Sequence, residues 1–186
     1  LSGMDLRGVK MTEASLLECK ADGSDFSGAE LTQLSVVMTS MRGARFVDAT
    51  MRNARIQMKD DLTGCDFRGA VMPESNLRDV PLAGADFSGA NLVDCDFSGC
   101  NLQGAKFVGA DAKGSRWVRA DLTDADLRNA DLMEAVLQKA TLDGADFRDA
   151  GLYAADMARV IVRRPARMEG AHLTRVRVYP KRKHEP

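Results

Sequence analysis

The residues best suited to acid–base chemistry are aspartates that recur at every fifth position. Residues 120–134 repeat Ala-Asp-Leu three times, which places carboxylates at Asp121, Asp126 and Asp131. Two carboxylates can work as a general acid and a general base only if they converge on one substrate. On a helix, residues five apart are rotated by about 140° from one another, and on a strand they lie on opposite faces. Neither element would therefore bring the three carboxylates together. We therefore predict no carboxylate active site.

Nucleophilic and metal-binding residues are also sparse. Cys65, Cys95 and Cys100 lack the C-x-x-C spacing and the nearby histidines of a zinc site. His172 and His184 are the only histidines, and no Ser or Cys nucleophile signature accompanies them. We expect no catalytic residue, no metal site and no cofactor, and hence a protein that is not an enzyme.

A period of five governs most of the chain. From Leu62 to Met157 a central residue, large except at Ala112, recurs every five residues, usually with a small residue two positions earlier. The same pattern runs upstream from Leu6 to Ile56 in a frame displaced by one residue, so one extra residue lies near positions 57–61. A chain that turns a corner about every five residues would bring all these side chains inside. The sequence therefore predicts a solenoid.

Three segments carry a specific match: GADFSGANL (84–92), CDFSGCNLQGAKF (95–107) and ADLTDADLRNADL (120–132) resemble the pentapeptide-repeat family. The resemblance extends from about residue 4 to 178. It implies an all-β fold, a right-handed quadrilateral β-helix of about eight to nine coils with four repeats per coil. We expect this solenoid over residues 1–178, with an irregular C-terminal coil and cap at 158–178 and a basic tail at 179–186.

Four repeats per coil would stack residues twenty apart in one column, with a single interval of 21 at the frame shift. One such column contains six of the seven phenylalanines, which should stack at the strand spacing of about 4.8 Å. The predicted structural core contains Phe26, Phe46, Phe67, Phe87, Phe107, Leu127, Phe147 and Trp117. We interpret these residues as core and not as a ligand site.

Charge is distributed unevenly along the predicted rod. Residues 61–157 carry nine basic and seventeen acidic side chains, whereas residues 158–186 carry nine basic and two acidic ones. An outward column contains Asp66, Asp86, Lys106, Asp126 and Asp146. Such a ladder either imitates a phosphate backbone or consists of solvated aspartates that form the corners. We favour the second interpretation.

The C-terminal end is rich in arginine, at Arg163, Arg164, Arg167, Arg175 and Arg177. These residues either protect the open strand edge of the last coil or bind an acidic partner or nucleic acid. Few aromatic residues accompany them, so we expect no direct nucleic-acid binding.

Two methionines near the frame shift, Met38 and Met58, occupy positions that the repeat assigns to the surface. Methionine-rich surfaces recur at protein interfaces, which makes these residues candidates for a docking patch. The alternative is a local bulge that buries some of the apolar residues in these coils.

These features favour a non-enzymatic protein–protein interaction scaffold. The resemblance implies two functional types, of which the first is the repeat domain of secretion-associated bacterial proteins, such as type VI adaptors or effectors. The second is a DNA mimic that binds DNA gyrase and protects it from quinolones. We favour the first, because the chain starts with Leu1 inside a repeat, as expected for part of a longer protein, and ends in a basic tract.

We also expect a bacterial cytoplasmic location, with delivery by a secretion system as an alternative. No apolar run is long enough to span a membrane. The sequence also allows a homodimer formed through a terminal coil.

Overall fold

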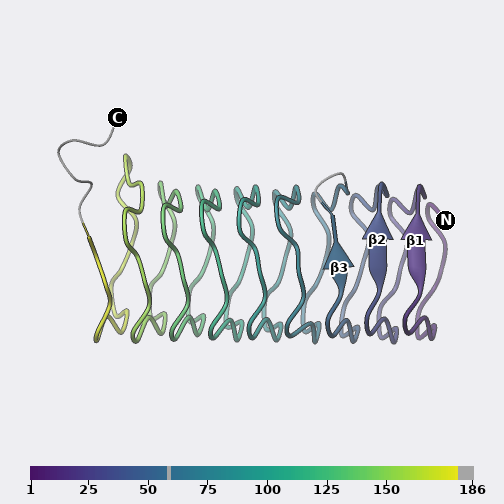
Figure 1. Ribbon diagram of the computed structural model, residues 1–186, viewed down its shortest axis with the longest axis horizontal. Coiled ribbons are helices and arrows are strands. Elements are labelled where there is room, and N and C mark those ends of the chain that lie inside the picture. Colours follow the sequence, from purple (N-terminus) through teal and green to yellow (C-terminus); the bar gives the residue numbers. More distant parts are fainter. Residues whose placement is uncertain (58–59, 180–186) are drawn as a thin grey trace.

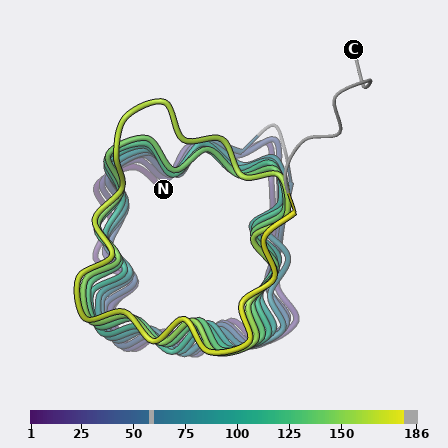
Figure 2. The same cartoon turned by 90° about the vertical axis from the view of Figure 1, so that its left-hand side faces the viewer.

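The chain coils into a rod with a four-sided cross-section. The computed structural model describes residues 1–57 and 60–179, and its coils stack side by side along one axis (Figures 1 and 2). Three short parallel strands, β1 (Ser15–Leu17), β2 (Ser35–Val37) and β3 (Arg55–Ile56), lie next to one another on one side of the rod. Further along the rod, neighbouring coils pair through single-residue parallel bridges. The fold is a right-handed quadrilateral β-helix, which confirms the predicted architecture.

Local hydrogen bonds turn the chain at each corner. Around Gly64, the amide of Cys65 donates to the carbonyl oxygen of Leu62 at 3.2 Å, and Gly64 itself has a φ of 69°. Glycine adopts this left-handed conformation without steric cost, and asparagine and aspartate tolerate it. Aspartates before the large residue add a second restraint, because the Oδ1 atom of Asp66 accepts a hydrogen bond from the amide of Arg68 at 3.2 Å.

Hydrogen bonds between coils set the register of twenty residues. The amide of Phe67 donates to the oxygen of Asp86 at 2.7 Å, and the amide of Asp86 donates back to the oxygen of Cys65 at 2.9 Å. Arg45 pairs with Asp66, an interval of 21 residues, so the extra residue lies where the sequence places the frame shift. Backbone pairing therefore stacks equivalent residues of every coil into columns.

Buried side chains fill the inside of the rod. The rings of the phenylalanine column, from Phe26 to Phe107, stack with centroids 4.7 to 5.1 Å apart and nearly parallel planes. A second column stacks Phe97 on Trp117 at 4.6 Å. Leu127 and Phe147 are buried in the first column, above the last ring of the stack. The inward columns therefore form one continuous core.

Two insertions interrupt the regular coil, and a buried aspartate supports each of them. At the first, the two carboxylate oxygens of Asp60 accept hydrogen bonds from the amides of Thr39 and Gln57, both at 2.7 Å. The second lies between Ile161 and Arg167, where the pairing interval changes from 20 to 21 residues. There the Asp143 carboxylate accepts hydrogen bonds from the amides of Arg163 and Arg164. These carboxylates supply hydrogen-bond acceptors to backbone amides at the points where the regular coil is interrupted. The repeat pattern locates the first insertion near residues 57–61 and predicts only an irregular coil at the second. It does not reveal the role of Asp60 and Asp143.

Candidate interaction surface

Three of the four cysteines are packed as core residues. Cys65, Cys95 and Cys100 are buried, and burial raises the pKa of each thiol to about 12, so they carry no reactive thiolate near neutral pH. Each thiol donates to a backbone oxygen of the preceding coil. Within residues 1–57 and 60–179, no three His, Cys, Asp or Glu side chains group as a metal site would require. The same residues include no helix of the length and apolarity that a membrane span needs.

The aspartate column is neutralised by neighbouring arginines. Arg68 pairs with Asp66, Arg128 with Asp126 and Arg148 with Asp146, each with an Nη2–Oδ2 distance of 2.7 Å. Hydrogen bonds from these guanidinium groups lower the pKa of all three carboxyl groups. Asp86 lies 3.9 Å from the Nζ atom of Lys106 in the next coil. We use the name aspartate face for the described outward positions on the side of the rod that carries the aspartate column and, inside, the phenylalanine column. The aspartate face carries nine acidic and seven basic side chains.

Most of the C-terminal arginines contact coils that precede them. Arg163 and Arg164 bind Asp143 through their backbone amides, and the Arg164 guanidinium also pairs with Asp124 at 2.8 Å. Arg167 lies 3.7 Å from Asp146 of the preceding coil. These contacts fasten the last coil to the rod and favour the interpretation of this segment as a cap.

The remaining two arginines are held less firmly. The Arg175 guanidinium lies over the Tyr153 ring at 5.6 Å from its centroid. Arg177 pairs through its backbone with Asp156. These two arginines also lie against the preceding coil.

An apolar patch lies on the side of the rod that carries β1–β3. Leu17 at the end of β1 is 60% exposed and Met38 is 43% exposed, while Val37 lies beside Leu17 in the strand register. Met58, the other methionine of the predicted patch, lies outside the described residues. Contiguous exposed apolar side chains are a common feature of protein contact sites.

The same side is basic along the rest of its length. We call it the strand face, defined as the described outward positions that align with β1–β3 in successive coils. Its basic side chains are Arg55, Arg78, Arg116, Arg119, Lys139, Arg159 and Arg177. Its acidic side chains are Glu18, Asp79, Asp96 and Asp156. The strand face therefore carries a formal net charge of +3, opposite in sign to the −2 of the aspartate face on the other side of the rod.

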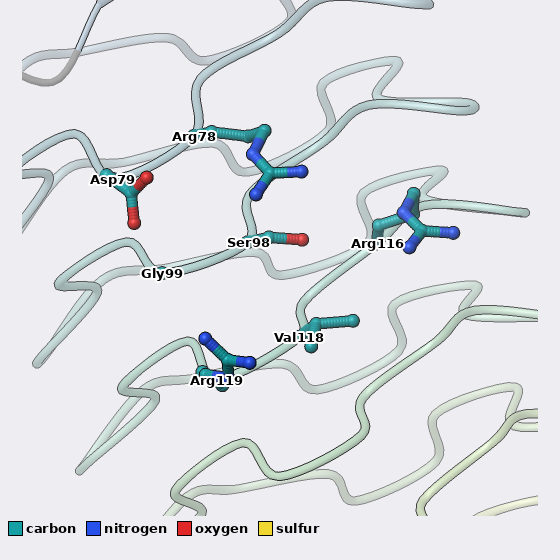
Figure 3. A pocket seen from close by; sticks show the side chains of 7 residues that line it. All are labelled: Arg78, Asp79, Ser98, Gly99, Arg116, Val118 and Arg119. Carbon is teal, nitrogen blue, oxygen red and sulfur yellow. The ribbon is translucent and has the colours of Figure 1, made fainter.

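Three shallow depressions follow one another on and beside the strand face. The first, of about 410 Å³, includes Gln33 and Arg55. The second, of about 310 Å³, shares Arg55 with the first and Arg78 with the third. The third, of about 180 Å³, is lined by Arg78, Asp79, Ser98, Gly99, Arg116, Val118 and Arg119 (Figure 3). Shared lining residues make these depressions a continuous shallow band along the rod.

Met38 was predicted from the sequence as a candidate contact residue, whereas the arginines of the band were not. The band takes its arginines from three different coils, with Arg55 in one, Arg78 in the next, and Arg116 and Arg119 in a third. The register of twenty brings these residues to one side. A tally of charge by column, rather than by segment, could have found this basic face from the sequence.

Known proteins share both the repeat and the fold. The sequence matches the pentapeptide repeats in eight copies, over residues 1–33, 61–99, 82–116, 100–138, 118–152 and 130–163. A search of curated proteins finds no match. A trypsin-treated variant of QnrB1, a plasmid-mediated fluoroquinolone resistance protein, superimposes with a TM-score of 0.80 and 20% identity, over 96% of this chain and 90% of that one.

A second trypsin-treated QnrB1 variant gives a TM-score of 0.64 at 20% identity, over 95% of this chain and 87% of that one. Similarity at this level of identity shows the fold alone. Proteins built from these repeats are generally structural or binding proteins. Because the repeat match covers most of its length, the chain belongs to the pentapeptide-repeat family.

Proposed function

We propose that this protein is a non-enzymatic scaffold for protein–protein interaction and that the strand face is its binding surface. The observation that carries the proposal is the combination, on one side of the rod, of exposed Leu17 and Met38 with a continuous band of depressions whose lining includes four arginines. A preorganised surface loses little conformational freedom on binding, so contacts along the rod translate efficiently into affinity.

The charge of the strand face indicates the kind of partner. A face with a net charge of +3 attracts an acidic protein surface and accelerates its association. The apolar patch at β1 and β2 would then supply the desolvated contacts that hold the complex together. We propose an acidic protein partner that spans both parts of the face.

A role in a bacterial secretion-associated protein rests on the family resemblance, and we keep it as a proposal for the biological setting. The second candidate is binding of DNA gyrase, which also rests on the family resemblance. Pairing of Asp66, Asp126 and Asp146 with arginines argues against it, because a mimic of DNA should present uncompensated negative charge.

Capture from a lysate of the native host tests the proposal if two matched variants accompany the wild-type rod. Leu17→Glu/Met38→Glu adds two negative charges to the strand face. Glu18 already adopts the backbone conformation of Met38, with φ of 51° at both positions, so a glutamate fits there. Val47→Glu/Val108→Glu adds the same charge to the aspartate face.

We expect one specific protein to be retained by the wild type and by the Val47/Val108 variant, and lost with the Leu17/Met38 variant. Equal retention by all three would refute the strand face as the binding surface. A supercoiling assay with purified DNA gyrase separates the second candidate, because dose-dependent inhibition by the rod would favour gyrase binding.

A further inference from the structure

The third depression of the strand face contains a buried hydroxyl group that lacks a partner among the described residues. Ser98 is only 6% exposed, and its Oγ atom has no hydrogen-bond partner within residues 1–57 and 60–179. An unpaired buried hydroxyl group is costly, which makes such groups rare in folded proteins. Ser98 therefore differs from an ordinary surface serine of the repeat.

Equivalent residues of other repeats show what Ser98 lacks. A hydroxyl two positions after an aspartate donates to that aspartate in several repeats, as Ser88 does to Asp86 and Thr123 to Asp121, both at 2.6 Å. The amide of Ser98 donates to Asp96 at 2.9 Å, but its hydroxyl group does not. The Ser98 hydroxyl is therefore an unused donor in the wall of the depression.

Two guanidinium groups flank this hydroxyl group. Arg78, from the preceding coil, and Arg116, from the following coil, both contact the Oδ2 atom of Asp96, at 3.6 and 4.0 Å. Contact with one shared oxygen shows that the two groups are close enough to bind one ligand together. The Ser98 side chain extends toward the side on which both lie (Figure 3). Asp96 thus acts as a positioning residue for the arginine pair.

The charge and shape of the depression select the type of anion. Its lining has three arginines and Asp79. Asp96, which does not line the depression, pairs with two of these arginines and brings the formal net charge of the whole group to +1. A singly charged anion would balance this charge, whereas a phosphate dianion would exceed it. Val118 also lines the depression and suits the methylene groups that carry a side-chain carboxylate.

We propose that this depression is a carboxylate-binding site that receives an aspartate or glutamate side chain of the protein partner. Arg78 and Arg116 would donate to the carboxylate oxygens and the Ser98 hydroxyl would supply a further hydrogen bond. The proposal rests on the proposed scaffold function, since it identifies the group that the strand face recognises on its partner.

Two-dimensional ¹H–¹⁵N NMR of the full chain tests the site with sodium acetate as the probe, at constant ionic strength set with sodium chloride. We expect saturable shifts of the Ser98, Gly99 and Val118 amides. Ser98→Ala should weaken acetate binding at least about tenfold, the effect of losing one hydrogen bond to a charged group. The matched variant Ser88→Ala should leave the acetate affinity unchanged, and the same spectra report whether each variant is folded.

Two further probes identify the ligand. Inorganic phosphate should bind more weakly than acetate, and tighter binding of phosphate would overturn the assignment to a carboxylate. A blocked Gly-Glu-Gly peptide should shift the same amides as acetate, and failure to do so would overturn recognition of a protein side chain. Shifts that do not saturate, or that Ser98→Ala and Ser88→Ala affect equally, would refute the site.

Failure of this site is distinguishable from failure of the scaffold. The capture experiment depends on Leu17 and Met38, which do not line this depression. A partner lost with the Leu17/Met38 variant, together with no acetate binding, would leave the scaffold supported and the carboxylate site refuted.

Discussion

Replacing Phe87 by leucine should reveal how much the stacked rings stabilise the rod. Phe87 is fully buried and contacts three rings: Phe67 at 4.7 Å, Phe107 at 5.0 Å and Phe97 edge-on at 5.6 Å. An aromatic pair contributes about 0.5–1.5 kcal/mol beyond its buried area, so three pairs contribute roughly 1.5–4.5 kcal/mol. Leucine keeps the position apolar and removes these contacts.

Phe147→Leu is the matched control. Phe147 is also fully buried in the same column, but its described column neighbours, Leu127 and Met168, are not aromatic. Guanidinium unfolding followed by circular dichroism should therefore show a larger loss of unfolding free energy for Phe87→Leu, by roughly 1.5–4.5 kcal/mol. An equal or smaller loss for Phe87→Leu would refute the claim that ring stacking stabilises the core.

Three other predictions concern the corners and charges. Gly69→Ala and Gly89→Ala should each destabilise the rod by about 1–2 kcal/mol in thermal unfolding, because both glycines have positive φ. The exposed Asp48 carboxylate next to Gly69 can rotate away from an added methyl group, so a loss for Gly69→Ala that exceeds the loss for Gly89→Ala by more than about 1 kcal/mol would contradict this. Asp60→Ala should lower the free energy of unfolding by about 2–4 kcal/mol, because it leaves the amides of Thr39 and Gln57 unpaired. Asp61→Ala, at a half-buried neighbour, is the control. An equal or smaller loss for Asp60→Ala would refute the claim that Asp60 stabilises the insertion. Pairing with arginine lowers the pKa of the Asp66, Asp126 and Asp146 carboxyl groups, so these groups stabilise the fold at pH values above their unfolded pKa of about 4. This stabilisation is lost on protonation, and the melting temperature should fall as the pH drops below about 4. A melting temperature that stays constant down to about pH 2 would contradict the pairing.

The sequence predicted the architecture because the repeat specifies it at every level. Large residues at a period of five, small residues two positions earlier and corner aspartates all favour the same coil. The column of phenylalanines at intervals of 20 and 21 provided a check that the repeat motif does not contain. Local pattern and long-range stacking therefore agree in this fold.

The surface was less predictable because it depends on neighbours that the five-residue pattern does not describe. The acidic column from Asp66 to Asp146 is visible in the sequence, but its compensation by Arg68, Arg128 and Arg148 depends on side-chain direction. The unpaired hydroxyl of Ser98 depends on three successive coils. The contacts of irregular positions in a repeat protein therefore become visible only in the three-dimensional structure.

Site-specific photo-crosslinking in the native host tests the central claim most directly. A photoreactive residue is placed at Leu17 or Met38 on the strand face, or at Val47 or Val108 on the aspartate face. The scaffold proposal predicts one crosslinked protein from both strand-face positions and none from the other two. Crosslinks from the aspartate face alone, or equally from all four positions, would contradict the proposed binding surface.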